Sequence, residues 1–306
     1  MRIWLDTDLG SDVDDALALA YGLRHPGIEL VGISTVFGDV KLRTRCVEAL
    51  LEIAKAGPIP VLTGLGKPLT ERRAGVMFGH EGKGLLSDPV PQLRVEAEAE
   101  KETEARIDTL ASAMTDAAPD FVVAIGPLTN LAALVHAGAQ LPPLAMMGGK
   151  ASDVQLPGMT DRIGEWNFFS DPEAARAVLG AVEARPARIV PVEVTFRTAL
   201  EPEDLEALAS GDALCRTLHL LCGHWLDLLH SEFGTDNPTV ALHDPLTLAT
   251  LMEPDLCPFE LRRVEIDDKG NARAISGDPN AEIALDVDLP ALRKHLLEVW
   301  LGTFQA

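Results

Sequence analysis

Short apolar runs alternate with longer segments of helical character over the first two thirds of the chain. The pattern predicts strands at 3–5, 28–35, 60–62, 121–125, 144–147 and 188–192, and helices at 16–23, 42–56, 107–115, 130–136 and 172–179. The last of these helices has the clearest start, because Asp171 is a capping residue, Pro172 suits the first helical position and Glu173 the first turn. Strands and helices that alternate in this way predict a parallel sheet with right-handed crossovers.

The last third of the chain departs from this alternation. It predicts helices at 202–230, 244–252 and 290–301, with three short antiparallel strands at 259–265, 272–276 and 281–287. We therefore expect an α/β fold: an open, Rossmann-like, mostly parallel sheet flanked by helices, with a small antiparallel addition near the C-terminus. Because the pattern runs on without a linker, we expect residues 1–306 to form a single domain.

Composition and charge narrow the class of function. Hydrophobic residues make up 47% and charged residues 24% of the 306 positions, which is ordinary for a globular protein with a large core. The formal net charge of -21 argues against binding to a nucleic-acid backbone or to an anionic membrane, because both require clustered basic residues. A small neutral ligand is compatible with this charge.

Cysteine usage and the N-terminal segment favour a cytoplasmic protein. The four cysteines lack the spacing of a zinc motif, and we expect them to be buried thiols in a reducing compartment. The first predicted strand begins at once, without the pattern of a signal peptide, and no run of 18 apolar residues occurs. We therefore expect a cytoplasmic location.

The turn after the first predicted strand carries an unusual density of acidic groups. Five of the ten residues at 6–15 are aspartates: Asp6, Asp8, Asp12, Asp14 and Asp15. So many carboxylates repel one another unless protons or a cation neutralise them, and a metal ion is the simplest explanation. Capping of the next helix accounts for one or two of them, not for five. An EF-hand loop is excluded, because Gly10 occupies the fifth position, which needs a ligand, and no Glu stands at the twelfth.

Six later segments join this turn in a recognisable order. They are His-Glu-Gly-x-Gly-Leu at 80–85, Gly-Pro-Leu-Thr-Asn at 126–130, Met-Gly-Gly at 147–149, Glu-Trp-Asn at 165–167, Asp-Pro-Glu-Ala at 171–174 and His-Asp-Pro at 243–245. With the opening Asp-x-Asp-x-Gly and Asp-Asp-Ala, the chain resembles the nucleoside hydrolases, especially the inosine-uridine-preferring type, from Leu5 to about Trp300. Many members have two fewer residues between Asp8 and Asp14, which places Asp12 in an insertion of undefined role.

The resemblance implies Ca²⁺-dependent hydrolysis of the N-glycosidic bond of ribonucleosides, which gives ribose and a free base. It assigns the carboxylates of Asp8, Asp15 and Asp244 and the backbone carbonyl of Ile125 to the ion. Ca²⁺ suits this role because it is a hard cation that accepts six to eight oxygen ligands in flexible geometry. The same resemblance implies that Asp8 is the general base and that the ion orients water and the ribose 2′- and 3′-hydroxyls.

The resemblance also implies residues that bind the nucleoside. Asp14 is expected to accept from the 2′-hydroxyl, Asn167 to hold the 3′-hydroxyl and Glu165 the 5′-hydroxyl. His243 is the expected proton donor to the leaving base, since imidazole titrates near neutral pH. His80 is expected either to approach the same base or to stabilise its own glycine-rich loop. Members of the family are dimers or tetramers, so we expect a homo-oligomer.

Two positions depart from the pattern of the family. Asp39 stands where inosine-uridine-preferring members usually carry Asn, which would add negative charge near the substrate. Met159, counted back from Glu165, stands where an Asn commonly binds the 5′-hydroxyl. We therefore expect relaxed recognition of the 5′-hydroxyl and leave the base preference open.

Two alternative functions compete with this interpretation. A haloacid-dehalogenase-like phosphatase also carries Asp-x-Asp after its first strand and uses Mg²⁺, but it requires Thr or Val where this chain has Gly10. A non-catalytic ribose- or nucleoside-binding protein would use the same calcium pocket. Asp8 and His243 argue against this second alternative, because a binding protein needs neither a base nor an acid.

Overall fold

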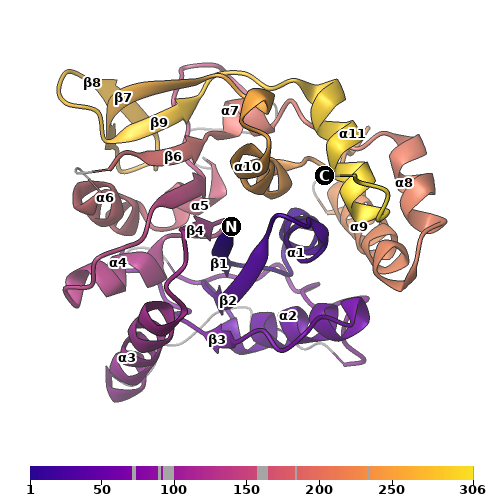
Figure 1. The fold of residues 1–306 in the computed structure, drawn as a ribbon, viewed down its shortest axis with the longest axis horizontal. Coiled ribbons are helices and arrows are strands. Elements are labelled where there is room, and N and C mark those ends of the chain that lie inside the picture. The colour runs from indigo at the N-terminus through magenta and orange to yellow at the C-terminus, as the bar shows by residue number, and fades with distance from the viewer. Residues whose placement is uncertain are drawn as a thin grey trace.

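The computed structural model describes residues 1–70, 74–88, 91, 100–156, 165–182, 185–232 and 234–305. Within these residues, nine strands form one sheet in the order β3-β2-β1-β4-β5-β6-β9-β7-β8 (Figure 1). The strands are β1 (Arg2–Thr7), β2 (Glu29–Thr35), β3 (Val61–Thr63), β4 (Phe121–Ala124), β5 (Leu144–Met147), β6 (Ala187–Val190), β7 (Phe259–Ile266), β8 (Ala272–Ile275) and β9 (Ala281–Ala284).

Parallel pairing extends from β3 to β9 across the sheet, and antiparallel pairing is confined to one edge. At the centre, Leu5 of β1 pairs with Ile33 of β2 on one side and with Val123 of β4 on the other. At the edge, β9 pairs parallel with β6 and antiparallel with β7, and β7 pairs antiparallel with β8. The predicted fold class, a mostly parallel sheet with a small antiparallel addition, is confirmed.

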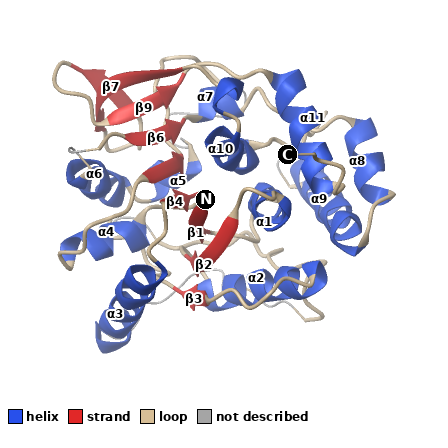
Figure 2. Ribbon diagram, in the orientation of Figure 1, coloured by secondary structure: helices blue, strands red, loops and turns tan. Residues whose placement is uncertain are grey.

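Helices cover both faces of the sheet (Figure 2). On one face lie α3 (Glu100–Ala117), α4 (Thr129–His136) and α6 (Pro172–Ala181). On the other face lie α1 (Asp14–Arg24), α2 (Val40–Ala54) and α10 (His243–Met252), with α8 (Pro202–Ala209), α9 (Ala213–Ser231) and α11 (Leu289–Trp300) outside them. The short elements are α5 (Trp166–Ser170), α7 (Val192–Thr195) and a 3-10 turn at Pro254–Leu256.

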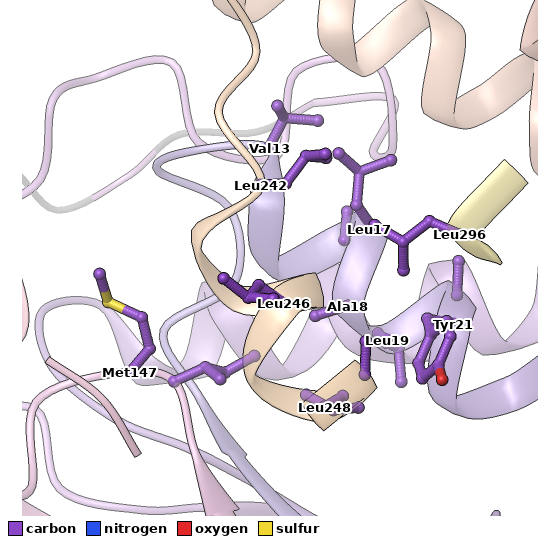
Figure 3. Close-up of a cluster of buried hydrophobic side chains, with 14 of the residues drawn as sticks. Val13, Leu17, Ala18, Leu19, Tyr21, Met147, Leu242, Leu246, Leu248 and Leu296 are labelled. Atoms are coloured by element: carbon purple, nitrogen blue, oxygen red, sulfur yellow. The ribbon is translucent and has the colours of Figure 1, made fainter. Parts of the chain in front are cut away.

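The hydrophobic core is divided between the two faces of the sheet. Along β1, Ile3 and Leu5 pack into the cluster under α1 and α10, whereas Trp4 packs into the cluster under α3, α4 and α6. This alternation explains why the strand reads as a continuous apolar run, since both of its faces are buried. In the first cluster, Ala18 of α1 lies beside Leu246 of α10 (Figure 3).

Three expectations about element boundaries are wrong. The helix predicted at 202–230 breaks into α8 and α9, because Asp212 starts a new helix by accepting a hydrogen bond from the Cys215 amide at 3.1 Å. The strand predicted at 188–192 ends at Val190, since Pro191 lacks the amide that a ladder requires. The helix predicted at 107–115 already begins at Glu100, with an Arg106–Glu102 ion pair one turn apart.

Two further properties of the chain concern its thiols and its helices. The four cysteine thiols are buried and form no disulfide. In the part of the chain that the structure describes, no helix combines the length and the apolar character that crossing a membrane demands.

Candidate active site

A cavity of about 280 Å³ opens at the carboxyl ends of four adjacent strands. Asp8 follows β1, Ile125 follows β4, Met147 ends β5 and Val192 follows β6, and all four residues line this cavity. From β1 the chain adds β2 and β3 on one side and then β4, β5 and β6 on the other. The cavity therefore lies where the direction of the connections reverses, between β1 and β4. Open α/β sheets bind their ligands at this kind of switch point.

Two helices point their N-termini into the cavity. Asp14 and Asp15 stand in the first turn of α1, and His243 and Asp244 in the first turn of α10. The two helices pack side by side, with Ala18 of α1 beside Leu246 of α10 (Figure 3). The partial positive charge at a helix N-terminus favours carboxylates, so two such ends help to hold several of them in one place.

Four aspartates, Asp8, Asp14, Asp15 and Asp244, form what we call the carboxylate floor. Asp14, Asp15 and Asp244 are buried and each offers an oxygen within 4.8 Å of the others. Burial, followed by mutual repulsion, raises the pKa of these three carboxyls well above the usual range, and burial raises that of Asp8 as well. A cation would relieve this repulsion, and hard oxygen donors suit a hard divalent ion. The residues present therefore fit a metal ion.

Asp12, which sequence reasoning left without a role, also lines the cavity. Its carboxylate, that of Asp14 and a ring nitrogen of His243 lie within 4.8 Å of one another. Burial raises the pKa of Asp12 to about 7. The inserted residue thus belongs to the acidic group at the cavity, on the side of His243.

The backbone around Asp8 leaves its carboxylate little freedom. Gly126 follows Ile125 after β4, and a Cβ at this glycine would lie 2.8 Å from Asp8 Oδ1. On the other side, Nη2 of the buried Arg43 lies 3.8 Å from Asp8 Oδ2. Only glycine fits against the carboxylate, and this explains why the Gly-Pro-Leu-Thr-Asn segment begins with glycine.

Glu165 and Asn167 also line the cavity, and hydrogen bonds to the backbone fix both side chains. Glu165 caps α5 and accepts hydrogen bonds from the amides of Gly149 at 2.7 Å, Phe168 at 2.9 Å and Asn167 at 2.5 Å. Burial still raises the pKa of Glu165 to about 7. Asn167 Nδ2 donates to the carbonyls of Ile125 at 3.1 Å and Met147 at 3.0 Å. With both amide hydrogens engaged, the oxygen of Asn167 is the atom left for a ligand.

Thr195 holds the imidazole of His243, since its hydroxyl oxygen lies 2.6 Å from Nδ1. Thr195 is fully buried at the end of α7, whereas His243 is half-buried at the cavity. Burial lowers the pKa of His243 to about 4. When the hydroxyl donates to Nδ1, the proton of the neutral ring is carried by the other nitrogen.

Four aromatic residues, Phe78, Trp166, Phe196 and Trp225, form what we call the aromatic wall. The rings of Phe78 and Trp166 lie 5.3 Å apart, and that of Phe196 lies 6.4 Å from His243. Phe78 and Phe196 are 40% and 39% exposed, which is high for phenylalanine and typical of a surface that binds a ligand. Sequence reasoning missed all four as site residues, although Trp166 stands between Glu165 and Asn167 in a segment that it had singled out.

Most of the predicted site residues meet in this cavity. Its lining includes eight of them: Asp8, Asp14, Asp15, Ile125, Glu165, Asn167, His243 and Asp244. Met159 lies outside the described residues. Asp39 is not part of the lining; it caps α2 and accepts a hydrogen bond from the Leu42 amide at 3.1 Å.

His80 lines a separate cavity next to the first. Its Nε2 donates to the carbonyl oxygen of Ser11 at 2.6 Å. This second cavity holds about 40 Å³, which is room for a few water molecules but not for a nucleobase. His80 thus binds the backbone of the acidic turn, while its ring lies 6.0 Å from that of Phe78 and 6.2 Å from that of Trp225, so both of its expected roles stay predictions.

Known proteins similar in sequence to this chain are nucleoside hydrolases. The family model described as inosine-uridine preferring nucleoside hydrolase matches residues 3–294. The probable uridine nucleosidase 2 of Arabidopsis thaliana is 27% identical over 97% of this chain and 96% of its own length. The non-specific ribonucleoside hydrolase RihC of Salmonella enteritidis is 29% identical over 98% and 97%.

Two solved structures share the fold. A plant nucleoside hydrolase, PpNRh1, covers 98% of each chain with a TM-score of 0.75 and 24% identity. The purine-preferring ribonucleoside hydrolase from Gardnerella vaginalis covers 99% of each chain with a TM-score of 0.77 and 20% identity.

Proposed function

Because this chain belongs to the inosine-uridine preferring nucleoside hydrolase family, whose members hydrolyse the N-glycosidic bond of ribonucleosides, we propose that it is a Ca²⁺-dependent ribonucleosidase. The observation that carries the proposal is the single cavity in which the carboxylate floor, Asn167 and His243 come together. The alternative of a phosphatase has no support in the family match. A nucleoside-binding protein without activity would not need His243 at the cavity.

The carboxylate floor would hold the cation, with Asp8, Asp15 and Asp244 as ligands and Asp14 close enough to Asp15 and Asp244 to join them. The Ile125 carbonyl would be a further ligand, since it lines the same cavity and keeps a second lone pair beside its hydrogen bond from Asn167. When bound, Ca²⁺ supplies positive charge that polarises water and orients the ribose diol.

Asp8 is proposed to take the proton from the attacking water. Its carboxylate lies between Gly126 and Arg43 at the rim of the floor, so it faces the cavity without freedom to turn away. Asp14 would accept from the 2′-hydroxyl of ribose and the Asn167 oxygen from the 3′-hydroxyl. These contacts fix the sugar so that its anomeric carbon faces the water next to Asp8.

His243 is proposed to give a proton to the departing base. Its ring is held through Nδ1 by Thr195, and the carboxylates of Asp12 and Asp14 lie near its ring. The base would leave along the aromatic wall, where Phe196 lies beside His243.

The 5′ end is proposed to face Glu165. Three backbone amides already occupy its carboxylate, which limits what it can offer to a 5′-hydroxyl. The role of Met159 stays a prediction, as do the homo-oligomeric state, a dimer or tetramer, the single domain and the cytoplasmic location.

The base preference is proposed to depend on the aromatic wall. Among similar proteins, some are named for uridine and others for purine nucleosides, although they share the fold. Apolar rings offer contact area to either kind of base without forming hydrogen bonds to the polar atoms at its edge. We therefore expect hydrolysis of both purine and pyrimidine ribonucleosides.

The experiment is a steady-state comparison of inosine, adenosine, uridine and cytidine with Ca²⁺ present, in which ribose and free base are both quantified. The proposal predicts equal amounts of the two products from at least one of these nucleosides. Binding of all four without any release of base would instead support the non-catalytic alternative.

A further inference from the structure

Ser11 connects the carboxylate-bearing turn to the loop at 78–82. Its hydroxyl oxygen accepts a hydrogen bond from Arg43 Nη2 at 3.0 Å, and its hydrogen is donated to Glu81 Oε1 at 3.3 Å. Its carbonyl oxygen accepts from His80 Nε2 at 2.6 Å. Ser11 is buried and lines the cavity, so two of its bonds tie the loop to the cavity edge and the third ties it to Arg43 of α2.

Glu81 organises the loop on its other side. One carboxylate oxygen accepts from the Phe78 amide at 2.6 Å, and the second accepts from the Gly79 amide at 2.8 Å. The Glu81 side chain is fully buried, and Gly79 has a positive φ of 97° that lets the backbone turn around it. The position of Phe78 therefore follows that of the Glu81 carboxylate.

Arg43 holds the acidic turn at residues 8–11 through hydrogen bonds. It is fully buried in the first turns of α2 and donates to the carbonyls of Phe37 at 2.6 Å and Leu9 at 3.2 Å, and also to that of Asp8. Its cation, the Ser11 hydroxyl and the Glu81 carboxylate form a continuous buried chain. In such a chain each hydrogen bond polarises the next, so its members act as one unit.

We propose that Ser11 is a positioning residue that, through Arg43 and Glu81, holds Phe78 in the aromatic wall and so sets the affinity for the nucleoside. The proposal rests on the function proposed above. The Phe78 ring lies 5.3 Å from Trp166, and a loop released from Ser11 would lose this contact. The Ser11 hydroxyl touches no reacting atom in the proposed reaction, so its loss affects binding rather than the chemical step.

The first test is kinetic. Ser11→Ala removes the hydroxyl but keeps the carbonyl that binds His80. The nearly isosteric Glu81→Gln replaces one acceptor oxygen with an NH2 group, which cannot accept from the amide of Phe78 or of Gly79. We expect each variant to raise KM for inosine about tenfold with kcat within about twofold, equivalent to about 1.4 kcal/mol of binding. The double variant is expected to resemble either single variant, because both break one unit. The exposed Ser87→Ala is the matched control and leaves KM unchanged.

The second test does not require activity. Lys83 directly follows the loop at 78–82 and is exposed, so trypsin cleavage after it reports how firmly the loop is held. Ser11→Ala and Glu81→Gln are each expected to speed this cleavage about tenfold. An unchanged cleavage rate, an unchanged KM, or a double variant near a hundredfold would overturn the proposal. If the wild-type protein hydrolyses no nucleoside, the proposed function fails, and the positioning role for binding fails with it, whereas cleavage still reports on the loop.

Discussion

The carboxylate floor and the aromatic wall bound the same cavity but are built in different ways. The floor stands on the end of β1 and on the first turns of α1 and α10, where regular hydrogen bonding fixes the backbone. The wall comes from a loop, from the end of α7, from α5 and from the distant helix α9. Its two phenylalanines are about 40% exposed, whereas the aspartates of the floor are buried. From this difference we propose that the floor carries the chemistry and that the wall sets affinity and base preference.

The largest effect that separates floor from wall is expected when one carboxylate of the floor is replaced by an amide. Asp8→Asn removes the proposed base while it keeps size and burial. We expect kcat/KM for inosine to fall by about 10³-fold or more, since a positioned base contributes about 10²–10⁴-fold. The exposed Asp116→Asn on α3 is the control and keeps wild-type kinetics. Near-normal turnover in the Asp8 variant would place the base elsewhere.

The floor could be predicted from the sequence because its residues follow strand ends or open helices. Asp8, Asp14 and Asp15 lie close together in the chain, and the topology of parallel strands brings Ile125 to them. The wall could not be predicted in this way. Trp225 lies in the middle of an amphipathic helix, and its place at the cavity depends on how α9 packs. Asp39, which departs from the family pattern, and His80, which matches it, were both expected near the substrate, but Asp39 caps a helix and His80 binds the backbone carbonyl of Ser11.

The second prediction concerns the boundary between floor and wall, where His243 stands. His243→Ala is expected to cost about 10²–10⁴-fold in kcat/KM for inosine, whose base needs a proton to leave. The cost for p-nitrophenyl riboside should be small, because its leaving group departs as a stable anion. Equal losses on both substrates would assign His243 to the support of the sugar or of the floor.

The third prediction tests how burial of Asp6 makes the free energy of unfolding depend on pH. Asp6 is fully buried beneath the floor, and burial raises its pKa to about 7. Between pH 4 and 7 the folded protein keeps this proton while the unfolded chain has lost it, so the free energy of unfolding falls as the pH rises. Asp6→Asn removes this loss.

In chelator, the Asp6 variant should match the wild type near pH 4 and exceed it by about 2–4 kcal/mol at pH 8, as measured by urea unfolding. The exposed Asp116→Asn again provides the control. A variant less stable than the wild type at pH 8 would mean that the fold stabilises the ionised Asp6 carboxylate and lowers its pKa instead of raising it.

The smallest expected effect belongs to the wall. Trp225→Ala removes a large ring from the cavity and should raise KM about tenfold with little change in kcat, because aromatic contacts contribute about 0.5–1.5 kcal/mol beyond buried area. Trp225→Phe keeps a ring and should stay within about threefold of the wild type. A loss in kcat rather than in KM would move Trp225 from binding to chemistry and blur the distinction between floor and wall.

The most direct measurement is a Ca²⁺ titration of chelator-treated protein during inosine hydrolysis, with Mg²⁺ in parallel. The account predicts that metal-free protein loses nearly all activity and that Ca²⁺ restores it as one ion binds per chain, because the floor needs a cation to bring its carboxylates together. Binding of Ca²⁺ to the folded state should also raise the thermal midpoint. Full activity in the chelated protein would contradict the account.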